Sequence, residues 1–207
     1  MIEIIKDINN GILQSAYVKL SFPEAKGVLK NEGYRLPSLQ EMAQLRLKEG
    51  FHPHVSKNGT WTKEGLIHLP GKGMFLTKNS PIMWGNNDIE ATNCFKKDQE
   101  FYLTPEQVEG SLVDSIPLLI KYIPTDRLAE SDIGVYAFGD LAKPYGDFLK
   151  KWGYDYLPIY NAEGAMVDKP FVRQIWLRNL SHWSAIDGDS RGFHFNGVIR
   201  GVKDLKL

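Results

Sequence analysis

The stretch GYRLPSLQE, residues 33–41, shows most clearly how this chain begins to fold. The Ser38 hydroxyl can accept from the third residue of a following helix while the Glu41 side chain reaches back to the cap, which is the capping-box pattern. Pro37 disfavours a helical conformation at Leu36, so the residues before Ser38 are expected to be extended. The stretch therefore predicts a short connector that ends in the first turn of a helix.

A helix is predicted on each side of this connector. The downstream helix covers 38–49, has an apolar face that includes Leu39, and stops at Gly50. The upstream helix covers about 23–32, with a proline in its first turn and Gly33 placed to end it. The two helices are the clearest local signals in the sequence.

After residue 50 the pattern changes to short aromatic or β-branched segments bounded by Gly, Asn and Pro, which is typical of strands and turns. One more helix is predicted over 144–152, closed by Gly153. The predicted strands are 60–62, 73–77, 82–84, 154–160, 171–178 and 193–200. Two early helices followed by many short strands indicate an α+β fold.

The length of the chain favours a single domain over residues 1–207, with an insertion at about 86–132. Within the insertion, Thr104 and Pro105 are typical of a helix start, and an apolar run is broken by Pro117. The insertion is therefore expected to have mixed helical and strand structure.

The composition excludes several classes of function. The 25 Lys and Arg residues balance 25 Asp and Glu residues, so no net positive field favours a nucleic-acid partner. Cys94 is the only cysteine, which excludes an internal disulfide and a Cys-based zinc site. The first apolar run carries charges and no apolar stretch approaches membrane-spanning length, so neither a signal peptide nor membrane insertion is expected.

Residues 178–202 differ in composition from the rest of the chain. This window contains no Lys, Glu, Gln or Met, whereas these four types supply 41 of the other 182 residues. At that frequency the window would hold about five or six of them. One interpretation is a Gly- and Ser-rich pair of surface strands that happens to lack long flexible side chains.

The early connector and two late segments together resemble the C-type-lectin fold. The late segments are IWLR, residues 175–178, and GVIRGV, residues 197–202. They are most similar to the branch shared by formylglycine-generating enzymes and the variable proteins of diversity-generating retroelements. In that branch a G-x-R-L-P-[ST]-x-x-E element joins two helices and an Arg-Gly-Val strand closes the domain. The resemblance implies two helices packed on short antiparallel sheets, with both chain ends contributing to a sheet.

The resemblance also implies an origin for the unusual composition of residues 178–202. In retroelement systems the adenines of a template are randomised as it is copied into the end of the gene, and Asn codons are the usual targets. Randomising the first two bases of such a codon never yields Lys, Glu, Gln, Met or Trp. Every residue from Arg178 to Val202 except Trp183 can arise in this way, so Trp183 would be a fixed residue.

The resemblance therefore implies a variable, ligand-binding surface in this segment. Rigid aromatic and His side chains lie next to small hydrogen-bonding residues, a composition typical of paratopes. The candidate ligand-contacting residues, which we expect to be exposed on one face, are Ser181, His182, Ser184, Ala185, Asp187, Asp189, Ser190, Phe193, His194, Phe195 and Asn196. Trp176, Arg178 and Trp183 are expected to pack beneath this surface as scaffold.

Metal sites are weakly indicated. Asp187 and Asp189 have the spacing of ligands in calcium loops, but no Glu lies near them. His52 and His54 could bind a metal with His68, although Pro53 splays the first two. We expect no metal and no cofactor.

Catalysis is weakly indicated as well. Ser181, His182 and Asp187 supply the residue types of a hydrolytic triad, but no nucleophile-elbow motif surrounds the serine. Cys94 has no local catalytic signature and is expected to be a small buried side chain. Formylglycine-generating enzymes use a pair of cysteines near the C-terminus, and this chain has none there. We therefore expect a protein without enzymatic activity.

Two binding functions remain. The first is a display protein whose C-terminal surface is diversified to recognise a protein or another macromolecule on a target surface. The second is a C-type-lectin-like adhesin or carbohydrate binder without diversification. A template repeat and a reverse transcriptase beside the gene would distinguish the first from the second. The sequence leaves open the ligand, the oligomeric state and the localisation, with a virion-associated or surface-displayed role among the possibilities.

Overall fold

The computed structural model describes residues 3–9, 11–161, 168–181, 184–188 and 197–205. The strands are β1 (Ile5–Asn9), β2 (Leu13–Leu20), β3 (Thr60–Leu69), β4 (Gly73–Thr77), β5 (Phe101–Tyr102), β6 (Ser115–Pro117), β7 (Tyr122–Pro124), β8 (Tyr156–Tyr160), β9 (Phe171–Leu177), β10 (Ile186–Asp187) and β11 (Gly197–Asp204). The α-helices are α1 (Phe22–Asn31), α2 (Leu39–Glu49), α3 (His54–Lys57), α4 (Asn87–Lys96), α5 (Pro105–Leu112), α6 (Asp132–Phe138) and α7 (Ala142–Lys151). Short 3-10 segments are η1 (Pro81–Met83), η2 (Thr125–Glu130) and η3 (Gly139–Leu141).

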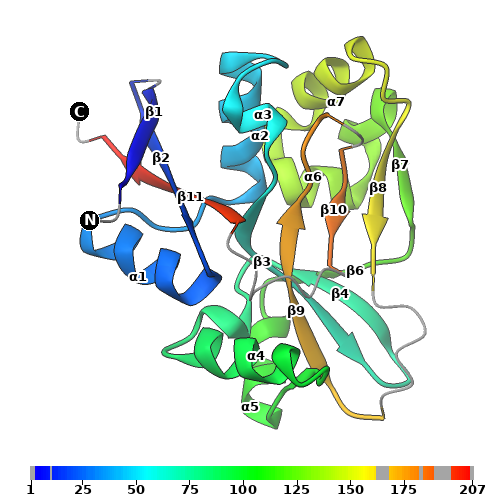
Figure 1. Cartoon of the computed structure of the whole chain (residues 1–207). Coiled ribbons are helices and arrows are strands. Elements are labelled where there is room, and N and C mark those ends of the chain that lie inside the picture. The colour runs from blue at the N-terminus through cyan, green and yellow to red at the C-terminus, as the bar shows by residue number, and fades with distance from the viewer. Residues whose placement is uncertain (1–2, 10, 162–167, 182–183, 189–196, 206–207) are drawn as a thin grey trace.

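The described strands form two sheets (Figure 1). The smaller sheet has the order β1-β2-β11, is antiparallel, and joins the two ends of the chain, as expected. The larger sheet has the order β6-β4-β3-β9-β10-β8-β7, with β5 paired to β9. Its strands are antiparallel except β10 and β8, which run parallel. The fold is therefore α+β with curled sheets.

Helices cover the large sheet on both sides. On one side α2, α6 and α7 contribute Met42, Phe138 and Leu149 to a core that includes Ile175 and Ile186 from the sheet. On the other side α1, α4 and the small sheet surround Trp61 in a second apolar cluster. In Figure 1, α1 lies beside the small sheet while α4 and α5 lie below the large one. Both faces of the central strands are consequently buried.

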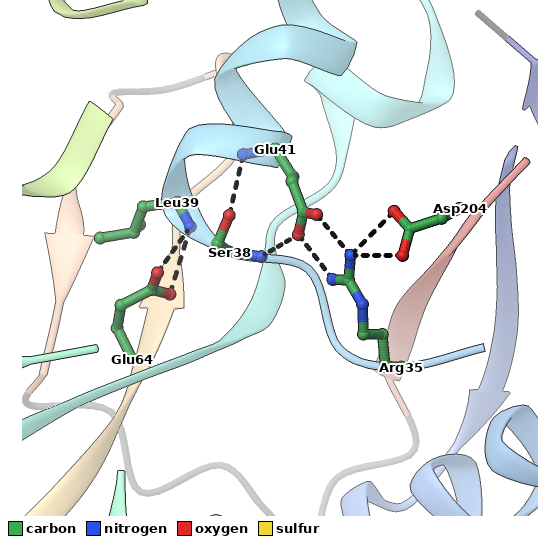
Figure 2. A network of polar contacts seen from close by, with 6 residues as sticks. All are labelled: Arg35, Ser38, Leu39, Glu41, Glu64 and Asp204. Atoms are coloured by element: carbon green, nitrogen blue, oxygen red, sulfur yellow. Dashed lines mark hydrogen bonds and ion pairs between the residues drawn. The ribbon is translucent and has the colours of Figure 1, made fainter. Parts of the chain in front are cut away.

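The connector over residues 33–41 joins the two helices as predicted and also contacts the last strand. Ser38 caps α2 and the capping box with Glu41 is complete. The Arg35 guanidinium donates two hydrogen bonds to Glu41, at 2.7 and 2.9 Å, and a third of 3.2 Å to Asp204 (Figure 2). The backbone of Arg35 pairs with that of Val202 in an antiparallel bridge. Two of the three segments that carry the resemblance, the connector and the last strand, are thus in direct contact.

The helix predicted over 144–152 corresponds to α7, and strands occur at the predicted ranges except one. Residues 82–84 were expected to be extended, and this expectation is wrong for 82 and 83. Pro81 starts the 3-10 turn η1, in which the Trp84 amide donates to the Pro81 carbonyl at 3.1 Å. Of the predicted strand 193–200, residues 193–196 lie outside the described part of the chain, and the remainder opens β11.

The stretch predicted as an insertion, about 86–132, contains α4, α5 and three short strands of the large sheet. Thr104 caps α5 through a capping box with Gln107. β6 pairs with β4 and β7 pairs with β8, at opposite ends of the strand order. The mixed structure expected there is present.

Candidate binding surface

The chain between β9 and β10 is here called the 178–185 loop, of which the structure describes residues 178–181 and 184–185. β10 lies between two strands, because Ile186 pairs with Leu177 of β9 and with Ile159 of β8. The Arg178 amide donates to the Ala185 carbonyl at 2.9 Å and closes the base of the loop. The loop therefore extends from the end of the most central strands of the large sheet (Figure 1).

A buried arginine from α2 supports the loop from below. Arg46 has no exposed surface, and its Nη2 donates to the Arg178 carbonyl at 2.7 Å. Its Nη1 donates to the Tyr145 hydroxyl at 2.9 Å, and its Nε donates to the Val55 carbonyl at 3.4 Å. One guanidinium thus links the loop to α2, α3 and α7.

Further bonds to the loop also involve its main chain. The Leu180 amide donates to the Ser56 carbonyl at 2.7 Å, and the Tyr154 hydroxyl donates to the Leu180 carbonyl. Just after the loop and β10, the Gly188 amide donates to the Tyr160 carbonyl at 2.9 Å. These contacts hold the backbone of the loop, and the buried Leu180 side chain adds a contact with the core.

Three of the expected ligand-contacting residues are buried, so the expectation of exposure was wrong for them. Ser184 and Ala185 are 0% exposed and Asp187 is 1% exposed. The Asp187 carboxylate accepts from the Arg178 Nε at 2.7 Å, and the Arg178 guanidinium lies 4.9 Å from the centre of the Tyr160 ring. The physical reason is that both faces of the large sheet are covered here: Ile186 of β10 packs into the core with α2, α6 and α7, and Asp187, which projects from the opposite face, lies against Arg178.

Of the other candidates, Ser181 is exposed as expected. The following residues lie outside the described part of the chain: His182, Trp183, Asp189, Ser190, Phe193, His194, Phe195 and Asn196.

Trp176, on β9, packs against Trp61 and close to Gly59. Its indole meets the Trp61 ring edge to face, with centroids 5.0 Å apart. A Cβ atom at Gly59 would collide with the Trp176 ring, so only glycine fits there without a shift. Trp176 therefore contacts β3 and the residue before it, and Arg178 of the ion pair contacts Tyr160 of β8.

An aromatic platform, defined by Phe51, His52 and Trp152, lies next to the loop and was not predicted. The Phe51 and Trp152 rings stack with centroids 4.3 Å apart, and the His52 ring meets both edge to face. Trp152 is 37% exposed. Ser56 connects the platform to the loop. Its hydroxyl donates to the carbonyl of Gly50, next to Phe51, and its carbonyl accepts from the Leu180 amide of the loop. A signal for it exists in the sequence: Phe51 follows Gly50, Trp152 precedes Gly153, and both glycines are predicted to end helices.

Of the possible metal and catalytic sets, only His52, His54 and His68 lie wholly in the described part of the chain, because the other two sets include His182 or Asp189. No group of three or more His, Cys, Asp or Glu side chains in that part of the chain has the geometry to hold a metal. His54 stacks on Tyr17 and its Nδ1 lies 3.0 Å from Arg200 Nη2. Burial and the Arg200 charge lower the pKa of His54.

Cys94 lies on α4 and is only partly buried, where full burial was expected; its burial nevertheless raises the thiol pKa.

Among the described residues no helix has the length and apolar character that crossing a membrane would require.

The Asp187 ion pair leads to a stability prediction. Asp187→Ala is expected to lower the free energy of unfolding by about 2–3 kcal/mol, because it removes a buried anion that accepts from the partly buried Arg178 guanidinium. Chemical denaturation at neutral pH measures the change. Ser181→Ala is the control and should stay within about 0.5 kcal/mol of the parent. An equally small effect of Asp187→Ala would show that its burial carries no energetic weight.

These features define the class of fold: the protein has a C-type lectin fold. A solved structure that covers 96% of this chain, and is itself covered over its full length, matches with a TM-score of 0.66 at 12% sequence identity. The description of that structure reads "Accommodation of massive sequence variation in Nanoarchaeota by the C-type lectin fold". No protein-family model and no curated protein matches the sequence.

Proposed function

We propose that this protein is a ligand-binding display protein whose C-terminal surface is diversified by retroelement mutagenesis. The observation that carries the proposal is the way the 178–185 loop is held. Arg46, Ser56 and Tyr154 all bond its main chain, so the exposed Ser181 side chain can change while these bonds hold the backbone. A surface that tolerates many sequences requires such a framework, because stability must then come from elsewhere.

The depletion of Lys, Glu, Gln and Met in residues 178–202 supports the same proposal. Among the candidate residues, Ser184, Ala185 and Asp187 belong to the framework in this proposal, because a buried side chain offers no surface to a ligand. The proposed contact residues are Ser181, His182, Asp189, Ser190, Phe193, His194, Phe195 and Asn196.

In this proposal the partner is a protein or another macromolecule on a target surface. The protein acts without catalysis, metal or cofactor, and neither nucleic acid nor a membrane interior is its target. The aromatic platform would supply a fixed part of the surface, since half-exposed Trp side chains at rigid positions often dominate binding energy. The neutral balance of charges is consistent with recognition by shape and hydrogen bonding.

The test compares two libraries displayed on yeast. One randomises Ser181, His182, Phe193 and Phe195, and the matched library randomises Ser184, Ala185 and Asp187. We expect the first library to remain folded, with melting temperatures within about 2 °C of the parent. It should also yield binders to two unrelated immobilised probes, hen lysozyme and streptavidin. The second library should lose most of its folded members.

Equal loss of folding in both libraries would contradict the proposal, because the first set would then belong to the core. The genomic neighbourhood separates diversification from the alternative adhesin function. A template repeat that differs from the gene at adenines, beside a reverse transcriptase, is expected. Its absence would favour an adhesin or carbohydrate binder with a fixed surface.

A further inference from the structure

A cavity of about 590 Å³ lies outside the C-terminal surface, between α1, the connector and the segment from η1 to α4. None of its lining residues belongs to 178–202, so it is independent of the proposed display function. Its volume falls within the range of about 300–1,000 Å³ that is typical of small-molecule sites. Residues of α1, which lies beside the small sheet in Figure 1, and of α4 line it.

The interior of the cavity is largely apolar. The buried Leu29 and Leu36 line it, together with Met83 and Ile89. Ile89 is 51% exposed, although it belongs to a helix whose other apolar side chains pack inward. An apolar body in the cavity would cover this side chain and remove its surface from water.

The charged residues of the lining are mainly cationic. Lys26, Lys30 and Arg35 line the cavity, with Asp88 as the acidic residue among them. Lys26 Nζ lies 2.9 Å from Asp88 Oδ1, and Arg35 is held by Glu41. Lys30 follows Lys26 by one helical turn, so the two ammonium groups lie on the same face of α1.

Lys30 is exposed and forms no ion pair within the described part of the chain. The Lys30 ammonium group, which has no carboxylate partner in the described part of the chain, can pair with one acidic group of a ligand, and the apolar cavity beside it can hold an apolar body. A nucleotide or a multiply phosphorylated ligand fits less well, because Lys26 and Arg35 are already engaged by carboxylates. The charges of the lining therefore favour a ligand with a single negative charge.

We propose that this cavity binds a small amphiphilic monocarboxylate, with its apolar body against Leu29, Leu36 and Ile89 and its carboxylate beside Lys30. The bound carboxylate gains a charge-assisted contact, and the apolar body replaces water along the cavity walls. The ligand is a free small molecule rather than a segment of a protein partner.

The test is isothermal titration calorimetry of the full chain with decanoate at low ionic strength, where surface charges are least screened. One site per chain is expected. Lys30→Met should weaken decanoate binding about fivefold, the loss that corresponds to one partly exposed ion pair. Ile89→Asp should abolish binding, because it removes an apolar contact and adds a like charge. Decanol should bind the parent about fivefold more weakly than decanoate.

Matched controls are Lys48→Met on α2 and Ile12→Asp, whose parent residues are also exposed and lie away from the cavity. Both should bind decanoate like the parent. Unchanged binding in Lys30→Met and Ile89→Asp would overturn the proposal, as would equal affinity for decanol. Absence of decanoate binding together with capture of an acidic peptide would overturn it in favour of a protein-docking groove. None of these outcomes bears on the C-terminal display libraries.

Discussion

Replacement of Arg46 by alanine is expected to lower the free energy of unfolding by about 3–5 kcal/mol. Arg46 is fully buried and is among the largest buried side chains of the protein. The substitution opens a cavity and leaves the Arg178 carbonyl and the Tyr145 hydroxyl without their donor. Buried polar groups that lose their partner contribute much of the cost. Urea denaturation at neutral pH measures it.

The same substitution should loosen the 178–185 loop while the rest of the fold persists at low temperature. The Leu180 amide, which bonds the Ser56 carbonyl, should exchange its hydrogen faster than in the parent. Arg46→Lys should recover only part of the stability, since an ammonium cannot reproduce three donors in a planar arrangement.

Arg127→Ala is the matched control for Arg46→Ala, because the Arg127 side chain is 68% exposed and pairs only at the surface. It should change stability by no more than about 0.5 kcal/mol. If Arg46→Ala were as mild as Arg127→Ala and left hydrogen exchange at Leu180 unchanged, the buried guanidinium would not be the support of the loop. Faster exchange at Leu180 without a loss of global stability would place its role in the loop alone.

Local signals in the sequence were sufficient to predict the connector and the helices on each side of it. The capping box depends on Ser38 and Glu41, three residues apart, so it can be read without knowledge of the tertiary fold. The bonds of Arg46 could not be foreseen in this way. Its hydroxyl and carbonyl partners on Tyr145 and Arg178 lie 99 and 132 residues further along the chain.

The same distinction explains the errors in the candidate site. Small and polar residues such as Ser184 and Asp187 are typical of exposed loops, and nothing nearby in the sequence shows that β10 is inserted between β8 and β9. Burial there results from the parts of the chain that the tertiary fold packs on the two faces of the sheet. The aromatic platform was missed for a related reason, because its residues Phe51 and Trp152 are brought together only by the packing of two helix ends.

A buried carboxylate next to the connector gives the second large prediction, which concerns pH. Glu64 on β3 is 3% exposed, and its carboxylate accepts from the Leu39 amide at 3.1 Å, at the start of α2 (Figure 2). The amide and the N-terminus of the helix favour the ionised form. Burial outweighs them and raises the pKa of Glu64 to about 7.

The sign of the pH dependence follows from this pKa. Because the folded protein holds the Glu64 proton up to about pH 7 and the unfolded chain releases it near 4.5, this group favours folding most below pH 4.5. Its contribution is lost as the pH rises through 7, by about 3 kcal/mol in total. Glu64→Gln retains an oxygen that can accept from the Leu39 amide but does not titrate.

The stability of Glu64→Gln relative to the parent should therefore rise by about 3 kcal/mol between pH 4.5 and pH 8, as measured by urea denaturation at several pH values. Other groups, among them His54 with its lowered pKa, titrate equally in both proteins and cancel in the difference.

Glu41→Gln is the matched control on the same helix end and should behave in the opposite way. Burial of Glu41 opposes ionisation, but the hydrogen bonds from Arg35 and Ser38 overcome it and lower the pKa of Glu41. Its carboxylate thus stabilises the fold above the unfolded pKa, and that stabilisation is lost as the pH falls through the folded one. Glu41→Gln should cost most at neutral pH and least in acid. Parallel pH profiles for the two variants would contradict the assignment, because they would mean that burial and pairing do not separate two carboxylates placed at one helix N-terminus.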